Sequence, residues 1–209
     1  MTHQWNKPSG WIGRLLLRNM NTRHSGVTDW GLSHVKIGAR DVVLDVGCGG
    51  GRTVSKLATA AAEGKVYGVD HSQASLAVAT KTNAARIASG SVEIHNGTVS
   101  QLPFSDSMFD LITAVETHFF WPNLPGDVRE VVRVLKPGGT FAIIAEIYQG
   151  APSAMARAAA KHAPKYGMTL LSPDEHRQLL ASAGLGEIGV FTWPEKGWIC
   201  ARGRKVPVL

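Results

Sequence analysis

The chain has 209 residues, of which 44% are hydrophobic and 18% are charged, and this composition is typical of one globular domain. No apolar stretch reaches the roughly 18 residues that cross a bilayer, and the first residues lack the apolar core of a signal peptide. Two cysteines, Cys48 and Cys200, exclude a disulfide framework and predict a cytoplasmic protein. The net charge of +6 predicts a solvated basic surface, although such a surface also attracts nucleic acid, anionic lipid or acidic substrates.

Residues 1–40 precede the first predicted strand, and we expect them to form a helical lid segment that docks on the main domain, residues 41–209. Residues 11–20 have a mixed helical pattern, and residues 28–35 are typical of a second short helix. One interpretation is that this segment closes over a ligand site, with Trp30 and His34 facing the ligand. The alternative is that both side chains only pack against the domain.

A short apolar strand is predicted at 42–46, interrupted only by Asp45. A turn follows in which three positions lack side chains, so that the backbone can bend sharply and a ligand can approach: Gly47, Gly49 and Gly51. The helix predicted at 52–61 then directs its free N–H groups back at this turn. The stretch therefore predicts a ligand-binding turn, in which Cys48 serves as a small packing residue.

Strands and helices alternate after this turn. Further strands are predicted at 66–70, 91–95, 109–115 and 140–145, with helices at 73–88 and 127–135. This order indicates βαβ units, which build a parallel sheet covered on both faces, and right-handed crossovers make the arrangement doubly wound. The last third adds helices at 152–162 and 173–183 and an antiparallel hairpin at 188–193 and 197–201.

The spacing of the turn indicates which ligand it holds. A dinucleotide fingerprint places its third glycine at the sixth position, where this chain has Arg52, and no Gly-Lys-Ser/Thr closes a P-loop. Asp70 ends the second predicted strand, and its separation from Gly47 is close to the roughly 20 residues expected of a carboxylate that binds a ribose diol. The combination predicts a nucleoside-containing ligand that is not a dinucleotide.

Four stretches carry a family resemblance: 44–51 (LDVGCGGG), 66–72 (VYGVDHS), 102–111 (LPFSDSMFDL) and 133–140 (RVLKPGGT). They resemble class I S-adenosylmethionine-dependent methyltransferases, in particular the small-molecule, type 11-like group. The resemblance implies an α/β, Rossmann-like fold with a doubly wound, mostly parallel seven-stranded sheet of order 3-2-1-4-5-7-6 and an antiparallel last strand. It also implies S-adenosylmethionine as the cofactor and no metal.

The resemblance implies roles for particular residues. Asp45 would receive the cofactor's ammonium group or order the turn, and Asp70 would accept hydrogen bonds from both ribose hydroxyls. The family's usual adenine-binding acid is replaced by Thr98. The full set of implied cofactor contacts is Asp45, Gly47, Cys48, Gly49, Asp70, His71, Thr98, Val99 and Glu116. The acceptor pocket would be lined by Trp30, His34, Phe119, Trp121 and Tyr148.

The predicted reaction is methyl transfer to a small-molecule acceptor through an oxygen, nitrogen or carbon nucleophile. His118 is the candidate general base because its titration range fits, and plain packing is its alternative role. Nucleic acid is not expected as a substrate, since the segment after the fourth strand lacks the motifs of DNA methyltransferases. Two other functions stay open: a membrane-surface lipid methyltransferase that binds through its basic amino-terminal helix, and a non-catalytic cofactor-binding module. The acceptor and the oligomeric state cannot be read from the sequence.

Overall fold

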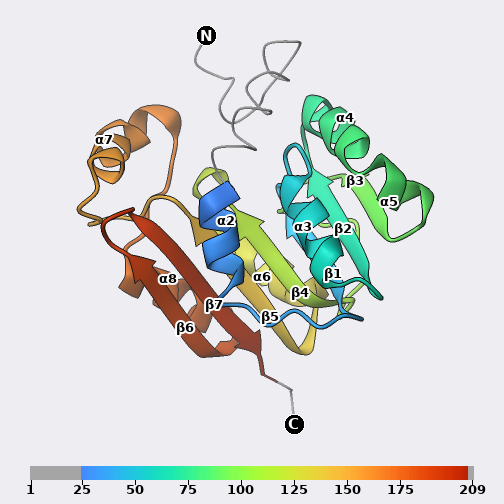
Figure 1. Cartoon of the computed structure of the whole chain (residues 1–209). Coiled ribbons are helices and arrows are strands. Elements are labelled where there is room, and N and C mark those ends of the chain that lie inside the picture. The colour runs from blue at the N-terminus through green and yellow to red at the C-terminus, as the bar shows by residue number, and fades with distance from the viewer. Residues whose placement is uncertain (1–24, 207–209) are drawn as a thin grey trace.

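The computed structural model describes residues 25–206, which form a central seven-stranded sheet flanked by helices (Figure 1). The strand order is β3-β2-β1-β4-β5-β7-β6, which confirms the predicted topology. The first five strands are parallel, and β7 runs antiparallel to both of its neighbours. The strands are β1 Val42–Val46, β2 Lys65–Asp70, β3 Val92–Asn96, β4 Phe109–Val115, β5 Leu135–Ala145, β6 Leu185–Trp193 and β7 Trp198–Lys205.

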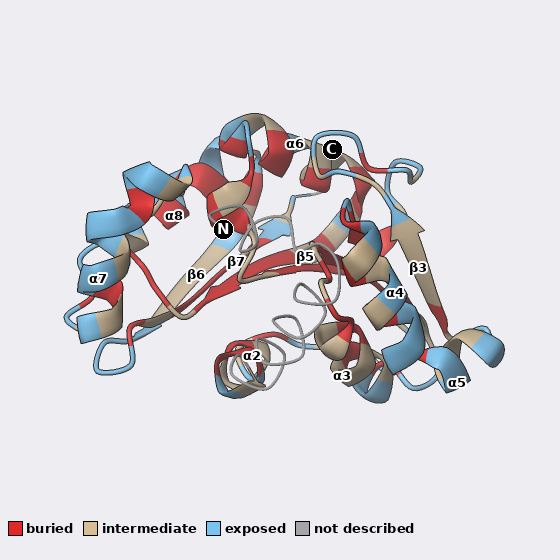
Figure 2. Cartoon of the chain, turned by 90° about the horizontal axis from the view of Figure 1, so that it is seen from above, coloured by how far each residue is buried: buried red, intermediate tan, exposed pale blue. Residues whose placement is uncertain are grey.

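Helices cover both faces of the sheet. Viewed from above, α2 and α3 lie on one side of it, and α6 and α8 lie on the other (Figure 2). The helices are α2 Ser25–Leu32, α3 Arg52–Ala60, α4 Gln73–Thr82, α5 Ala84–Ala88, α6 Leu124–Val134, α7 Ala154–His162 and α8 Pro173–Ser182, with short 3₁₀ helices η1 His118–Phe120 and η2 Ala163–Tyr166. None of these helices in residues 25–206 has the length and apolarity needed to cross a membrane.

The central strands are buried because each contributes apolar side chains to both layers. Leu44 and Ile112 belong to the cluster beneath α6 and α8, whereas Val43 and Leu111 belong to the cluster beneath α2 and α3. All four side chains are at most 1% exposed. Alternate residues of a strand point to opposite faces, so a continuous apolar run fills two cores at once.

Some element boundaries differ from those predicted. The helix predicted at 73–88 is divided at Asn83, whose buried side-chain amide donates to the carbonyls of Gly51 and Ala79 instead of pointing to solvent. β5 begins at Leu135, directly after α6, and so includes the residues before the strand predicted at 140–145. The helix predicted at 11–20 lies outside the described residues.

Helix α2 packs flat against the sheet. At Gly31, a Cβ atom would lie 2.4 Å from Cγ2 of Ile144 on β5, so only glycine allows this close approach. Val27 of the same helix is 1% exposed, and Trp30 packs beside Trp198 of β7. The described part of the predicted lid segment is therefore a covering layer of the sheet on the β5–β7 side.

Candidate active site

The glycine turn after β1 is fixed by the neighbouring strand. The N–H groups of Gly47 and Cys48 both donate to the carbonyl of Val69 on β2, at 2.8 and 3.0 Å. Gly47 has φ of 71°, and a Cβ atom on it would lie 2.3 Å from Oγ1 of Thr117. A side chain is excluded at Gly47 both by the backbone conformation and by Thr117, two residues after the end of β4.

Asp70 is held at the end of β2 by two backbone donors. The N–H of Gly49 donates to Oδ2 at 2.9 Å, and the N–H of Ser72 donates to Oδ1 at 2.8 Å. A carboxylate has about four acceptor positions, so each oxygen keeps one for a further donor. Asp70 is only 8% exposed, and it lines a cavity at this end of the strand. This geometry suits a pair of neighbouring hydroxyl groups.

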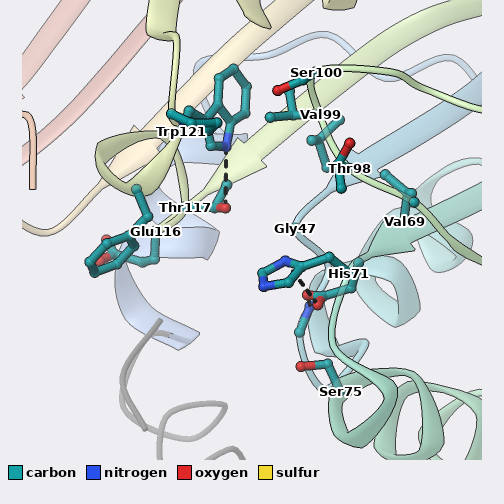
Figure 3. A pocket seen from close by; sticks show the side chains of 16 residues that line it. Gly47, Val69, His71, Ser75, Thr98, Val99, Ser100, Glu116, Thr117 and Trp121 are labelled. Atoms are coloured by element: carbon teal, nitrogen blue, oxygen red, sulfur yellow. Dashed lines mark hydrogen bonds and ion pairs between the residues drawn. The ribbon is translucent and has the colours of Figure 1, made fainter. Parts of the chain in front are cut away.

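The cavity has a volume of about 440 Å³ and opens at the carboxyl ends of the parallel strands (Figure 3). Gly47, Asp70 and Glu116 come from the ends of three different strands, β1, β2 and β4. The lining residues are Val46, Gly47, Gly49, Val69, Asp70, His71, Ser75, Gly97, Thr98, Val99, Ser100, Glu116, Thr117, Phe120, Trp121 and Pro122. Ligands of open α/β sheets bind at this edge, where neighbouring connections leave on opposite faces.

The wall opposite Asp70 is built by the segment after β4. Glu116 has φ of 58°, a strained conformation for a residue with a side chain, and its carboxylate accepts from the N–H of Glu146 after β5. Trp121 Nε1 donates to Thr117 Oγ1 at 3.4 Å, and Figure 3 shows these two side chains facing His71 across the cavity. The cavity therefore has an acidic floor and an aromatic wall.

Residues 44–143 match the family model described as a methyltransferase domain. This part of the chain is therefore similar to methyltransferase domains. The match begins in β1 and ends in β5, so it includes the strand ends that supply Gly47, Asp70 and Glu116. The match agrees with the class I, S-adenosylmethionine-dependent family predicted from the four sequence stretches.

Two curated relatives cover parts of the same region. A demethylmenaquinone methyltransferase of Symbiobacterium thermophilum is 38% identical over 102 residues, which are 48% of this chain and 41% of that protein. Cycloartenol-C-24-methyltransferase 1 of rice is 33% identical over 144 residues, which are 68% of this chain and 38% of that protein. The chain thus spans about two fifths of the length of these relatives.

Solved structures share the fold across nearly the whole chain. An S-adenosylmethionine-dependent methyltransferase from Aquifex aeolicus superposes with a TM-score of 0.75 at 20% identity. The superposition covers 92% of this chain and 98% of the other. The fold of this chain is therefore shared with that structure over 92% of its length.

Eight of the residues singled out from the sequence line the cavity: Gly47, Gly49, Asp70, His71, Thr98, Val99, Glu116 and Trp121. Other lining residues were not predicted from the sequence, among them Ser75, Gly97, Ser100, Thr117 and Pro122. One of these carries a local signal, because a glycine two residues after the strand predicted at 91–95 indicates a close approach. At Gly97, a Cβ atom would lie 3.0 Å from Pro103 and from Val69.

Asp45 and Cys48 lie behind the cavity wall. Asp45 is 2% exposed and accepts a hydrogen bond from Thr113 Oγ1 at 2.7 Å, so its carboxylate joins β1 to β4. Burial raises its pKa to about 7, opposed by the Thr113 hydrogen bond and reinforced by the charge of Asp70. The thiol of Cys48 is buried, and burial also raises its pKa. These placements match the ordering and packing alternatives for the two residues.

His118 is not among the residues that line the cavity, which contradicts its expected place beside the acceptor. Its side chain is 1% exposed and turns toward α8, where Nε2 lies 3.3 Å from Nε2 of His176. Burial and the nearby His176 lower its pKa well below the usual range. A general base needs contact with the proton it removes, so the structure favours the packing role.

Trp121 lines the cavity, whereas the four other expected acceptor contacts lie elsewhere. Trp30 and His34 pack against the β6–β7 hairpin. The His34 ring is stacked on that of Phe191, with ring centroids 4.3 Å apart. Phe119 and Tyr148 belong to a small apolar cluster with residues of α7. None of these four residues is among those that line the cavity, so their contacts with an acceptor stay predictions.

Proposed function

We propose that the domain binds S-adenosylmethionine and transfers its methyl group to a small-molecule acceptor. The observation that carries this proposal is the pairing of a side-chain-free turn at Gly47 with a carboxylate, Asp70, that keeps acceptor positions toward a cavity of about 440 Å³. The family match supports the same conclusion.

The residues present fit such a cofactor. Asp70 would accept from the two ribose hydroxyls, and the open backbone at Gly47 and Gly49 would lie against the methionine portion. No atom lies within 4 Å of the position that a Cβ of Gly49 would occupy, so there is room beside the turn. Thr98 and Val99, on the loop after β3, would contact the adenine. When bound, S-adenosylmethionine supplies an electrophilic methyl group.

The chain's own residues would then position the acceptor and exclude water. Phe120 and Trp121 form an aromatic wall of the cavity, and such rings stabilise a cationic group placed over their faces. Among the described lining residues, the ionisable side chains are those of Asp70, His71 and Glu116. Because orientation alone supplies much of the acceleration in a displacement between two bound reactants, the proposed reaction depends first on this wall.

The proposal is tested by calorimetry with S-adenosylmethionine and S-adenosylhomocysteine. Asp70→Asn keeps the shape of the side chain, but an amide cannot accept charge-assisted hydrogen bonds from both ribose hydroxyls. The affinity for both ligands should therefore fall by at least about tenfold. Glu63→Gln, on the exposed edge far from β2's carboxyl end, is the matched control and should bind normally. Equal affinity of wild type and Asp70→Asn would refute the ribose assignment.

Catalysis needs a separate measurement. Release of S-adenosylhomocysteine is followed with panels of phenol, amine, quinone and alkene acceptors, and turnover above the acceptor-free rate supports transfer. Phe120→Ala should lower this rate while leaving cofactor affinity within about threefold, since the ring is assigned to the acceptor side. Tight cofactor binding without turnover on any class would instead support a non-catalytic module.

A further inference from the structure

The tip of the β6–β7 hairpin lies at the same edge of the sheet as the cavity. Ala145 at the end of β5 pairs with Ile199 at the start of β7, so the turn at 194–197 is next to the carboxyl end of β5. The cavity opens where β1, β2 and β4 end, and these strands are parallel to β5. Figure 1 shows this shared edge toward the top of the molecule.

Three tryptophans gather at the hairpin tip. The rings of Trp193 and Trp198 flank the turn with centroids 5.4 Å apart, and Trp30 of α2 lies 6.5 and 5.9 Å from them. Trp193 is 40% exposed, and Val206 is the other large hydrophobic side chain exposed within residues 25–206. An indole ring is apolar with one polar N–H, which suits a boundary between water and hydrocarbon.

A positively charged lysine side chain lies close to two of these rings. Lys196 Nζ lies 5.1 Å from the Trp193 ring centroid and 4.8 Å from that of Trp198. The acidic neighbour Glu195 is offset by this lysine. The tip therefore presents a large aromatic surface that carries no net negative charge.

A basic segment adjoins the tip. Residues 147–173 contain no aspartate or glutamate, and α7 and η2 form within them. A Cβ atom on Gly197 would lie 2.5 Å from Oγ of Ser153, the N-cap of α7, so the hairpin turn and α7 are in contact. The exposed ionisable side chains of the segment are all basic: Arg157, Lys161, His162 and Lys165.

We propose that this edge surface, formed by residues 193–198 together with α7 and η2, binds the face of an anionic lipid bilayer. Its tryptophans would enter the headgroup layer, and its lysines and arginine would face the negatively charged lipids. Such peripheral binding needs no spanning helix. It would also bring the cavity edge to the bilayer, so that an apolar acceptor could enter from the lipid; this last step alone rests on the proposed methyl transfer.

Vesicle co-sedimentation of the full chain tests the proposal. Binding to phosphatidylcholine vesicles containing about 30% phosphatidylglycerol should exceed binding to pure phosphatidylcholine by about tenfold or more, and salt should weaken it. Lys161→Glu combined with Lys165→Glu should remove most of that difference. The matched control is Lys36→Glu with Arg40→Glu, which reverses two exposed charges at the opposite sheet edge, before β1, and should bind like wild type.

A second variant separates the aromatic contribution from the charges. Trp193→Ser should weaken binding several-fold to both kinds of vesicle, with circular dichroism showing an unchanged fold. Equal binding of wild type to neutral and anionic vesicles, or equal losses in the edge and control variants, would overturn the proposal. Binding to single-stranded RNA in place of vesicles would also overturn it. Calorimetry with S-adenosylhomocysteine tests the proposed function separately, since vesicle binding does not require the cofactor.

Discussion

His118 and His176 face each other inside the protein, with their Nε2 atoms 3.3 Å apart and both side chains at most 1% exposed. His176 Nδ1 lies 2.9 Å from the carbonyl of Ser172, which can only accept, so Nδ1 carries the proton. His176 Nε2 is then an acceptor, and His118 donates to it. His118 Nδ1 is left as a buried acceptor without a hydrogen-bond partner in the described part of the chain.

This pair should make the fold sensitive to mild acid. Burial lowers the pKa of both histidines, so below about pH 6.5 the unfolded chain binds more protons than the folded one. The contribution of these two histidines to the free energy of unfolding is therefore fully present above that pH and is lost as the pH falls below it. Between pH 7.5 and 5.5, the free energy of unfolding in urea should drop by about 1 kcal/mol per histidine beyond the drop in a His118→Gln, His176→Gln double variant. Parallel pH dependences in the two proteins would contradict this.

Asp45 should change stability with pH in the opposite direction to the histidine pair, because its carboxyl group favours the folded state in acid. Its pKa is raised to about 7 by burial, so the folded chain holds the proton more tightly, and the stabilisation at acid pH is lost as the pH rises toward 7. Asp45→Asn keeps an acceptor for Thr113 and cannot ionise. At pH 8 the variant should be more stable than wild type by about 2–4 kcal/mol, and at pH 5 the gain should shrink. Urea unfolding at both values checks this, and a pH-independent difference would refute it.

Gly47 should tolerate no side chain. Gly47→Ala places a Cβ 2.3 Å from Thr117 Oγ1 at φ of 71°, and we expect a loss of about 2–4 kcal/mol together with loss of cofactor affinity. Gly49→Ala is the control, because it has a similar φ of 51° and meets no atom within 4 Å. It should cost only about 1–2 kcal/mol. Thr117→Ala should partly rescue the Gly47 variant; absence of rescue would show that backbone strain, not the clash, decides the loss.

Asn83 should hold α4 to the glycine turn. Its Nδ2 donates to Gly51 O at 2.9 Å and to Ala79 O at 3.0 Å, and the side chain is 1% exposed. Asn83→Ala leaves a buried carbonyl without its donor and should cost about 1–3 kcal/mol. Thermal unfolding measures this loss. Ser89→Ala, an exposed change in the same connection, should shift stability by less than about 0.5 kcal/mol, and similar losses in both variants would count against the assignment.

The sequence by itself determined the sheet and the floor of the cavity. Alternating strands and helices, a glycine turn after β1 and an acid at the end of β2 are local patterns whose geometry follows from backbone conformation and strand direction. The positions of Gly47, Gly49 and Asp70 at the cavity therefore follow from the residue order alone. Their hydrogen bonds involve neighbouring strand ends that every parallel sheet of this order brings together.

Only the tertiary structure decided the opposite wall and the roles of the aromatic and histidine side chains. Whether His118 faces the cavity or the core depends on α8, which is far along the chain and supplies His176. Thr117 became a lining residue through its contact with Gly47, and Trp30 joined the hairpin tip through Trp198. The direction of a side chain at the end of a strand depends on which distant element packs over that strand end. The spacing of residues in the sequence does not predict that contact.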